Sequence, residues 1–393
     1  MRTSASMLVL VALICGCGES ETNGPPTVTV HPGQSIQAAV DGAVPGTVIL
    51  VQPGVYHESP AASRAVTITT DRIQIVAQST PDNPVVLENA GGQNAGIWVS
   101  PTDSVATYDS TEQAEHPPCG ENGNLLHGFQ LQGMTVRGFD QFGVYLACVD
   151  GFALTQNLAD GNQVYGLFPV RSHNGTMTHN EAQGTPLDAA LYVGQSDHVT
   201  MTGNSTHDNV LGLEVENSSD ITVTDNQVFD NTAGIVADVM PGLQKKEQTN
   251  VEFSGNDVHD NNRPNSAGPD QSVGLTPSGT GMVILGGSMV TAEHNSLSNN
   301  GFAGIIVAGF CSGTSVTGGQ CMAQDIDPNP ESNRIVNNQL SANGKSPPSN
   351  PLLRQLAADL IWDESGTGNC WSGNTASATV KIIGTTRTLP MCP

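Results

Sequence analysis

The stretch MTGNSTHDNVLGLEVENSSDITVTDN, residues 201–226, spans one complete unit of a repeat that recurs through most of the chain. Asn204 and Asn226 each close a strand-like segment in which apolar and polar residues alternate. Equivalent asparagines occur at seven positions, and the first intervals between them are 23, 24 and 22 residues: Asn157, Asn180, Asn204, Asn226, Asn256, Asn295 and Asn338. A regular period of this size is typical of a protein built from stacked structural repeats.

Residues at two fixed offsets from each asparagine are almost wholly apolar, which predicts that they point into a core. The residues three positions before are Leu154, Met177, Met201, Val223, Phe253, Ala292 and Ile335. Those two positions after are Ala159, Ala182, Thr206, Val228, Val258, Leu297 and Leu340. Three short strands per repeat predict an all-β, right-handed parallel β-helix, whose coils are too small to bury their inner faces alone and therefore stack. Leucine-rich repeats share the period, but their Leu-x-x-Leu-x-Leu pattern is missing. We expect the asparagines to form a structural hydrogen-bond ladder along one corner.

The sequence pattern divides the chain into four segments. We expect a lipoprotein signal peptide over residues 1–16, a linker over 17–26, the β-helix over 27–345 and a disulfide-closed capping segment over 346–393. The first segment has one Arg and a short apolar run, which is typical of an export signal and too short for a membrane span. Its end, LICGC, resembles a bacterial lipobox and would make Cys17 the lipidated first residue.

The start of the β-helix also carries a capping signal. Ser35 to Ala43 predicts a short amphipathic helix that closes the open end of the stack, with Ile36, Ala39 and Val40 on one side. Near the other end, the stretch LLRQLAADLIWD fits either a helix or a strand.

Composition and charge limit the classes of molecule that this protein is expected to bind. The chain of 393 residues has 44 Gly and an aromatic content of 4%, which suits many short strands and tight turns. Its 13 Lys and Arg against 37 Asp and Glu give a net charge of −24, which disfavours nucleic acid and anionic lipid as partners. We expect a monomer that contacts the membrane only through its lipid anchor, in the bacterial cell envelope as an outer-membrane lipoprotein or outside the cell.

Beyond Cys17 the chain has six cysteines, and an even number in an exported protein predicts disulfides. Proximity in the sequence favours three pairs: Cys119 with Cys148, Cys311 with Cys321, and Cys370 with Cys392.

Several stretches extend the repeat pattern to a family resemblance. VYGLFPVRSHNG, residues 164–175, together with the capping segment and the asparagine corners, resembles the pectate-lyase-like β-helix superfamily. Within it, the chain resembles the carbohydrate-binding and sugar-hydrolase β-helix group, which includes alginate epimerases. LDAALYVGQSDHVTMTGN, GLEVENS and DIDPNPES are similar to bacterial β-helix lipoproteins of unknown activity. The resemblance implies a polysaccharide or cell-envelope glycan as the partner.

One family feature is missing. Alginate epimerases carry Asp-Pro-His one residue after Tyr-Gly, whereas this chain has Phe168-Pro169-Val170 there. The epimerase mechanism is therefore not expected in that form unless Arg171 or His173 substitutes for the absent groups.

The alternation of the last strand in each repeat predicts an outward acidic face. Leu213 and Val215 point inward in this pattern, so Glu214 and Glu216 should face solvent, with Asp238 of the next coil over Glu216. Stacked strands lie about 4.8 Å apart, so these carboxylates would repel unless a cation, a shared proton or a basic neighbour relieves them. The insertion VMPGLQKKEQ, residues 239–248, is placed to overhang them and to bring Lys245 or Lys246 close.

Three chemistries fit this face. A lyase or epimerase would use a cation, with Ca²⁺ held by Glu216 and Asp238, to neutralise a uronate while a base removes the proton at C5. A hydrolase would use one carboxyl as acid and another as base or nucleophile. A binding site would stack aromatic rings on a sugar. The predicted catalytic residues are Glu214, Glu216, Asp238 and Arg171, and the predicted substrate-binding residues are Phe168, Tyr192, Gln195, Asn217 and Asp188.

We expect a lyase-like or epimerase-like activity on a polysaccharide. The alternative is a non-catalytic glycan-binding or structural protein of the envelope, because an acidic strand face also keeps a long sheet soluble.

Two further clusters are weaker candidates. His207-Asp208 and His259-Asp260 occupy equivalent places, but the coil of Phe229 lies between them, so the histidines should be too far apart to share a metal. The second cluster, at alternate positions that are typical of a calcium loop, consists of Asp325, Asp327, Asn329 and Glu331. Pro328 and Pro330 restrict its bending, which favours a bracing loop instead.

Overall fold

The computed structural model describes residues 24–101, 119, 124–269, 271–312, 321, 323, 325–376, 380–382 and 389–393. The predicted signal peptide and Cys17 lie outside these residues, as do most residues of the expected linker. Within the part described, no helix is long and apolar enough to cross a membrane.

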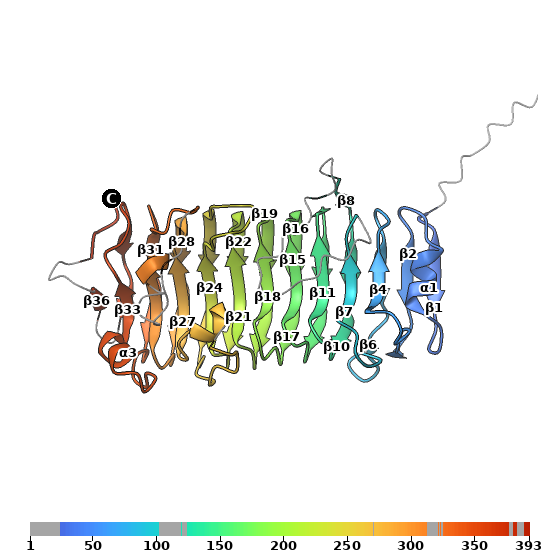
Figure 1. Cartoon of the computed structure of the whole chain (residues 1–393), viewed down its shortest axis with the longest axis horizontal. Coiled ribbons are helices and arrows are strands. Elements are labelled where there is room, and N and C mark those ends of the chain that lie inside the picture. Colours follow the sequence, from blue (N-terminus) through green and yellow to red (C-terminus); the bar gives the residue numbers. More distant parts are fainter. Residues whose placement is uncertain are drawn as a thin grey trace, which may run out of the picture.

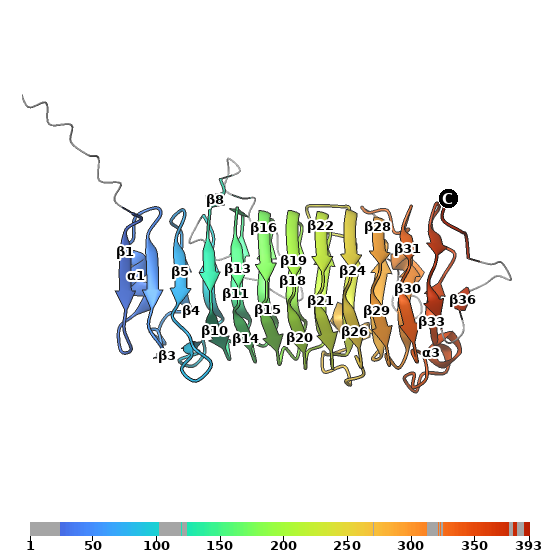
Figure 2. The same cartoon turned by 180° about the vertical axis from the view of Figure 1, so that it is seen from behind.

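The chain winds as a right-handed parallel β-helix, in which almost every coil adds one strand to each of three parallel sheets (Figures 1 and 2). Sheet A contains, in chain order, β1 (Thr27–Val30), β2 (Val48–Val51), β5 (Gln74–Ala77), β8 (Leu126–His127), β9 (Gln130–Gln132), β12 (Val149–Asp150), β13 (Ala153–Thr155), β16 (His173–Thr178), β19 (Asp197–Thr202), β22 (Ser219–Thr224), β25 (Thr249–Ser254), β28 (Ser288–Glu293), β31 (Arg334–Val336) and β34 (Cys370–Ser372). Sheet B contains β3 (Gly54–Tyr56), β6 (Val85–Glu88), β10 (Met134–Arg137), β14 (Leu158–Asp160), β17 (Glu181–Gln183), β20 (Ser205–His207), β23 (Gln227–Phe229), β26 (Asp257–His259), β29 (Ser296–Ser298), β32 (Gln339–Ser341) and β35 (Thr375–Ala376). Sheet C contains β4 (Arg64–Ile68), β7 (Ala95–Val99), β11 (Phe142–Ala147), β15 (Tyr165–Val170), β18 (Ala189–Gly194), β21 (Leu211–Glu216), β24 (Ala233–Asp238), β27 (Thr280–Leu285), β30 (Ala303–Ala308), β33 (Ala358–Trp362) and β36 (Val380–Ile382).

The interior of the coils is a continuous apolar core. The residues three positions before the repeat asparagines are all fully buried in it, and those two positions after them are also buried, as predicted. The asparagines form the expected ladder between sheets A and B: each side-chain amide donates to the Oδ1 of the next asparagine, over 2.9 to 3.0 Å, from Asn157 to Asn374. These bonds hold successive coils in one register.

A second asparagine ladder, not predicted from the sequence, lies at the corner between sheets B and C. Its unbroken part begins at Asn209, passes through Asn231 and ends where Asn343 donates to the buried Asp359. Asn162 holds the equivalent position two coils before Asn209, and Thr185 stands between them. Its signal is visible in the sequence as an asparagine five residues after most members of the first ladder. At the corner between sheets C and A, Ser172, Ser196 and Ser218 serve the same purpose, because the Ser196 and Ser218 hydroxyls accept the backbone N–H of the serine one coil earlier.

A short helix lies near each end of the β-helix. At one end α1 (Ile36–Asp41) buries Ile36 and Val40, as predicted, and its N-terminal N–H groups donate to the Ser35 hydroxyl and the Glu58 carboxylate. At the other end α3 (Pro351–Leu356) is followed directly by β33, so the stretch that fitted a helix or a strand forms both. The α1 and α3 helices lie at opposite ends of the molecule (Figure 1).

The β-helix continues past residue 345, where the sequence pattern placed its end. β33, β34 and β35 pair with β30, β31 and β32, respectively, and thus add another coil. The asparagine period had faded there because the coil begins with a helix, which interrupts the repeat. The three expected disulfides are present: Cys119–Cys148, Cys311–Cys321 and Cys370–Cys392.

Candidate active site

The acidic residues of sheet C are placed by strand register. Glu216 pairs with Gly194 below and with Asp238 above, so Glu216 and Asp238 are vertical neighbours as predicted. Leu213 and Val215 lie in the interior core, so the alternating glutamates project from the outer face of the sheet.

The expectation that these glutamates face solvent is wrong. Glu214 is 4% exposed, Asp238 is 6% exposed, and Glu216 is partly buried. Strand alternation predicts the side of the sheet but not how far that side is exposed, and here a second apolar cluster lies on the outer face. Ala267 and Val273 pack on this cluster, which extends to Val236 beside the acids. Both come from the segment between β26 and β27, which includes the η1 turn (Ser272–Leu275).

Carboxyl groups from two consecutive coils converge on this outer face. Glu214, Glu216 and Asp238 each offer an oxygen, and these oxygens lie within 4.8 Å of one another. We call these three residues the carboxyl cluster. Asp188, one coil earlier, lies near enough to raise the pKa of Glu214 and Asp238 by its charge.

Two tyrosine hydroxyls orient part of this group. Tyr192 Oη donates to Glu216 Oε1 over 2.7 Å, and Tyr165 Oη donates to Asp188 Oδ2 over 2.8 Å. The bond from Tyr165 was not predicted from the sequence, although its partner lies 23 residues, one coil, further along the chain.

The electrostatics of the site are set mainly by burial. Desolvation raises the pKa of Glu216 to about 7, although the Tyr192 hydrogen bond opposes the shift. Desolvation likewise raises the pKa of Asp188 to about 7, with the charge of Glu216 adding to it. For Glu214 and Asp238, desolvation and neighbouring carboxylates raise the pKa well above the ordinary value. Buried acids of this kind are typical of sites that move protons or hold cations.

The predicted aromatic residues belong to the outer cluster. Phe168 is 2% exposed and Tyr192 is 4% exposed, and their ring centroids are 4.5 Å apart in an edge-on arrangement. Tyr165 stacks on Phe168 with 4.1 Å between centroids. The rings therefore pack on each other in this structure, and their role in stacking on a sugar stays a prediction.

Arg171, Gln195 and Asn217 stack at the corner after sheet C, each with a positive φ that turns the chain sharply. Gln195 Oε1 accepts the backbone N–H of Gln244 over 2.9 Å, and Asn217 bonds to the backbone of Met240 and Lys245. The amide side chains thus hold the insertion of residues 239–248.

Arg171 has a different environment from the carboxyl cluster. Its side chain hydrogen-bonds to Tyr145, and burial lowers the pKa of the guanidinium. Arg171 lies two coils away from Asn217, the residue that directly follows Glu216. Its predicted part in catalysis therefore stays a prediction.

The insertion is bonded to the corner residues after sheet C, and its ammonium groups have partners other than the carboxyl cluster. Lys245 forms an ion pair with Asp197, and Lys246 forms one with Asp325. Gly242 also donates its backbone N–H to Asp325, so this aspartate fastens the insertion to the chain beyond β30. Of the residues spaced as in a calcium loop, Asp325 bonds to the insertion, and the Asp327 side chain accepts the backbone N–H of Asn329 in its own loop.

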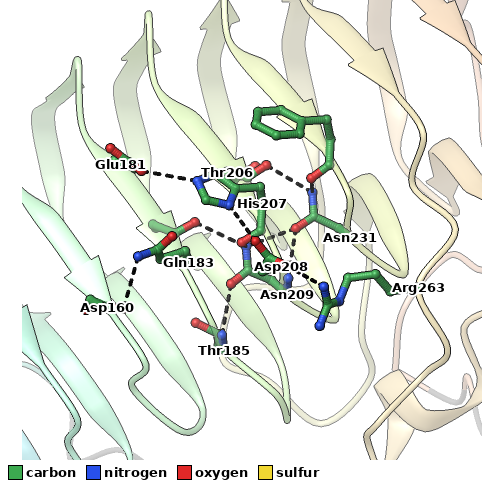
Figure 3. A network of polar contacts seen from close by, with 12 residues as sticks. Asp160, Glu181, Gln183, Thr185, Thr206, His207, Asp208, Asn209, Asn231 and Arg263 are labelled. Atoms are coloured by element: carbon green, nitrogen blue, oxygen red, sulfur yellow. Dashed lines mark hydrogen bonds and ion pairs between the residues drawn. The ribbon is translucent and has the colours of Figure 1, made fainter.

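The histidines of sheet B form a stacked surface feature. Phe229 lies between the rings of His207 and His259, with centroid distances of 5.0 and 5.3 Å, so they are too far apart to share a metal, as predicted. Burial lowers the pKa of His207, but the carboxylates of Asp208 and Glu181, one at each ring nitrogen, outweigh it and raise the pKa (Figure 3).

Comparisons with known proteins agree with the architecture. A family model described as a right handed beta helix region matches residues 142–321. A search of curated proteins found no significant match. Similar solved structures include the A-module of the mannuronan C-5 epimerase AlgE4 from Azotobacter vinelandii, with 15% identity, a TM-score of 0.58, and coverage of 86% of this chain and 82% of that one. The periplasmic alginate epimerase AlgG has 17% identity, a TM-score of 0.50, and coverage of 89% and 85%.

A third similar structure is the Dettilon tailspike protein, with 13% identity, a TM-score of 0.52, and coverage of 91% of this chain and 60% of that one. At these identities the likeness concerns the fold. The resemblance inferred from the repeat is confirmed at this level: the protein has the fold of the right-handed β-helix superfamily.

Proposed function

We propose that this protein is an exported polysaccharide-processing β-helix protein whose site is the carboxyl cluster on sheet C. The observation that carries the proposal is the convergence of Glu214, Glu216 and Asp238 within 4.8 Å, with Asp188 close by, in a fold where Glu216 and Asp238 share one strand position in successive coils. A stacked sheet gains nothing structurally from burying like charges side by side, so the arrangement is best explained by chemistry.

The reaction that this site supports best is lyase-like or epimerase-like. Both reactions begin when a base takes the proton next to a uronate carboxyl group, and a group with a pKa near the working pH does this most effectively. Burial raises the pKa of Glu216 and of Asp188 to about 7, so the site contains carboxyl groups that can exchange a proton near neutral pH. AlgE4 and AlgG are named as epimerases of mannuronan and alginate, which supports an acidic polysaccharide as the substrate class. The proposed site differs from the epimerase motif, because Phe168 and Val170 stand where that motif has Asp and His.

Calcium is part of the proposal as a cofactor, since the cluster consists of the hard oxygen ligands that this ion prefers. When bound, it would supply positive charge for a substrate carboxylate. Glu216 and Asp238 are its expected ligands.

The cell envelope is the proposed location. Three disulfides are typical of proteins that fold outside the cytoplasm. The lipobox-like residues before Cys17 add a lipid anchor to the proposal, as an outer-membrane lipoprotein or a protein released outside the cell. The partner is a polysaccharide or envelope glycan, bound by a monomer.

The test is a panel of uronate-containing glycans with two readouts. Absorbance of a new C4–C5 double bond reports elimination, and NMR of the C5 position reports epimerisation. Glu216→Gln and Asp238→Asn are expected to abolish turnover, while Glu252→Gln, which removes an exposed acid on the opposite sheet, keeps it. Turnover that survives both site variants would refute the proposal.

Burial favours a second candidate, a non-catalytic glycan-binding or structural protein. Glu214 and Asp238 are almost covered, and the Asn217 side chain is occupied by the insertion, so little of the site is free for a polymer. This candidate predicts glycan affinity without products on the whole panel, with or without chelator.

A further inference from the structure

The stacked rings on the outer face of sheet B form a column with two different ends. The Phe229 ring is inclined by 19° to the ring of His207 on one side and by 5° to the ring of His259 on the other. The ring centroids are 5.0 and 5.3 Å apart, close to the distance between parallel strands. Strand register therefore sets the spacing of the rings, and each coil supplies one of them.

The end of the column at His207 is closed. Both ring nitrogens of His207 are paired with carboxylates, Nδ1 with Asp208 and Nε2 with Glu181 (Figure 3). Gln183 holds the same strand position one coil earlier, and its side-chain amide donates to Asp160. The side chain of His207 is only 16% exposed, which leaves little of this end accessible to a ligand.

The end of the column at His259 is open. Ser298 and Ser341 follow His259 at the same strand position in the next two coils, so only serine side chains continue the column. The side chain of His259 is 32% exposed, Ser298 is half-buried and Ser341 is exposed. The face of the His259 ring that points away from Phe229 therefore borders a space over the two serines, which we call the serine shelf.

The His259 ring is held in place before a ligand arrives. Its Nδ1 pairs with Asp260 Oδ2 over 2.9 Å, and Phe229 packs on one face of the ring. Its Nε2 has no hydrogen-bond partner among the described residues and is left for a ligand hydroxyl. A ring that is already fixed loses little conformational freedom on binding.

The groups around the serine shelf suit a neutral sugar. A sugar ring has an apolar face of C–H groups and a rim of hydroxyls, and sites for such ligands combine ring surfaces with a few polar groups. The other outward residues of β26, β29 and β32 are exposed and can exchange hydrogen bonds with hydroxyls: Asp257, Ser296 and Gln339. None of the outward residues on these three strands is a lysine or an arginine. An anionic sugar would therefore meet the negative charges of Asp257 and Asp260 without a cationic partner on these strands.

We propose that the serine shelf is a second carbohydrate-binding site, which takes one ring of a neutral glycan against the open face of His259. The shelf lies on sheet B, apart from the carboxyl cluster on sheet C, and the inference does not depend on the proposed function. Two sites on different faces allow a neutral glycan to hold the protein while an acidic glycan occupies the other face.

The test measures binding to the mature protein by isothermal titration. The probes are neutral oligosaccharides of glucose, mannose, xylose and N-acetylglucosamine, with an oligomer of mannuronate as the anionic comparison. At least one neutral oligosaccharide is expected to bind at one site per chain, and the mannuronate oligomer should not displace it. His259→Ala should weaken this binding roughly tenfold, which is the size expected for the loss of one ring contact.

One further variant and one control make the assignment specific. Ser298→Phe places a fourth ring on the open face of His259, so it should abolish binding, while Tm should be no lower than that of the parent because the ring stack is extended. An unchanged or higher Tm separates a blocked shelf from a misfolded protein. The control, His57→Ala, removes an exposed histidine that also pairs with a carboxylate, Glu88, and should bind as the parent does.

Three results would overturn the inference: no neutral oligosaccharide binds, binding survives both His259→Ala and Ser298→Phe, or mannuronate displaces the neutral ligand. The proposed function fails separately. Glu216→Gln and Asp238→Asn are expected to leave binding at the serine shelf intact, so turnover on sheet C and neutral-glycan binding on sheet B can each be lost without the other.

Discussion

Replacing Asn226 with alanine should destabilise the protein more than most single substitutions. Asn226 is 1% exposed and belongs to the first asparagine ladder, in the coil that carries Glu214 and Glu216. Because the ladder holds adjacent coils in register, the substitution tests the interaction that places the acids side by side.

The size of the effect follows from the bonds that are lost. The Asn226 amide donates to Met201 O and to Asn256 Oδ1 over 3.1 and 2.9 Å, and its oxygen accepts the backbone N–H and the side-chain amide of Asn204 over 2.8 and 2.9 Å. A buried donor without an acceptor costs about 1–3 kcal/mol, and each other lost bond costs about 0.5–1.5 kcal/mol. The Asn204 N–H loses its ladder partner and the other three groups each lose one bond, which gives a loss of roughly 2.5–7.5 kcal/mol.

Urea unfolding, followed by the fluorescence of the buried Trp362 and Trp371, measures this loss. Hydrogen exchange gives a local readout, because the backbone amide of Asn204 should exchange faster in the variant. The control is Asn94→Ala at an exposed position, where the change should stay within about 0.5 kcal/mol. A loss below about 1 kcal/mol, with unchanged exchange at Asn204, would show that the ladder does not hold the register.

The remaining predictions concern a gap in the second ladder and two titrating groups. Thr185→Asn should raise the free energy of unfolding by about 1–2 kcal/mol. The Thr185 hydroxyl has no hydrogen-bond partner among the described residues, while Asn209 Oδ1 already accepts the Thr185 backbone N–H and can also accept an amide at this position. Urea unfolding measures the change, and a lower free energy of unfolding would contradict the reasoning. Because the pKa of His207 is raised on folding, its contribution to stability should be complete below about pH 6.5 and should disappear as pH rises through the folded value. A pH series of Tm for the parent and for His207→Gln checks this, and parallel curves would refute it. Tyr192→Phe should raise the pKa of Glu216 above about 7, because it removes a hydrogen bond to the charged form; carboxyl NMR titration measures the shift, and an unchanged pKa would count against the bond.

The sequence was sufficient for the fold because the repeat makes each coil a copy of its neighbour. The asparagine at Asn226 and the apolar residues around it fixed which side chains point inward, and strand alternation then placed Glu216 beside Asp238 correctly. A single period sufficed, since parallel stacking converts sequence distance directly into vertical position.

What the sequence could not predict lies in the corners. The burial of Glu214 does not follow from strand alternation, and segments that do not follow the repeat, such as the one that carries Val273, pack on the outer cluster of sheet C through long-range contacts. Lys245 was expected close to the acids, but its ammonium group forms an ion pair with Asp197 instead. Asp359, the last acceptor of the second ladder, is an aspartate where the pattern has asparagine, and no local signal marks it.

The corner after sheet C combines a constant scaffold with a variable excursion. Asn217 turns the chain and bonds to an insertion of residues 239–248, while the strands on either side keep their pairing. Segments at this corner can therefore be lengthened, shortened or exchanged without changing the strand pairing of the β-helix. The surface around the acids can thus change through the loops at this corner while the strand pairing that positions the acids stays the same.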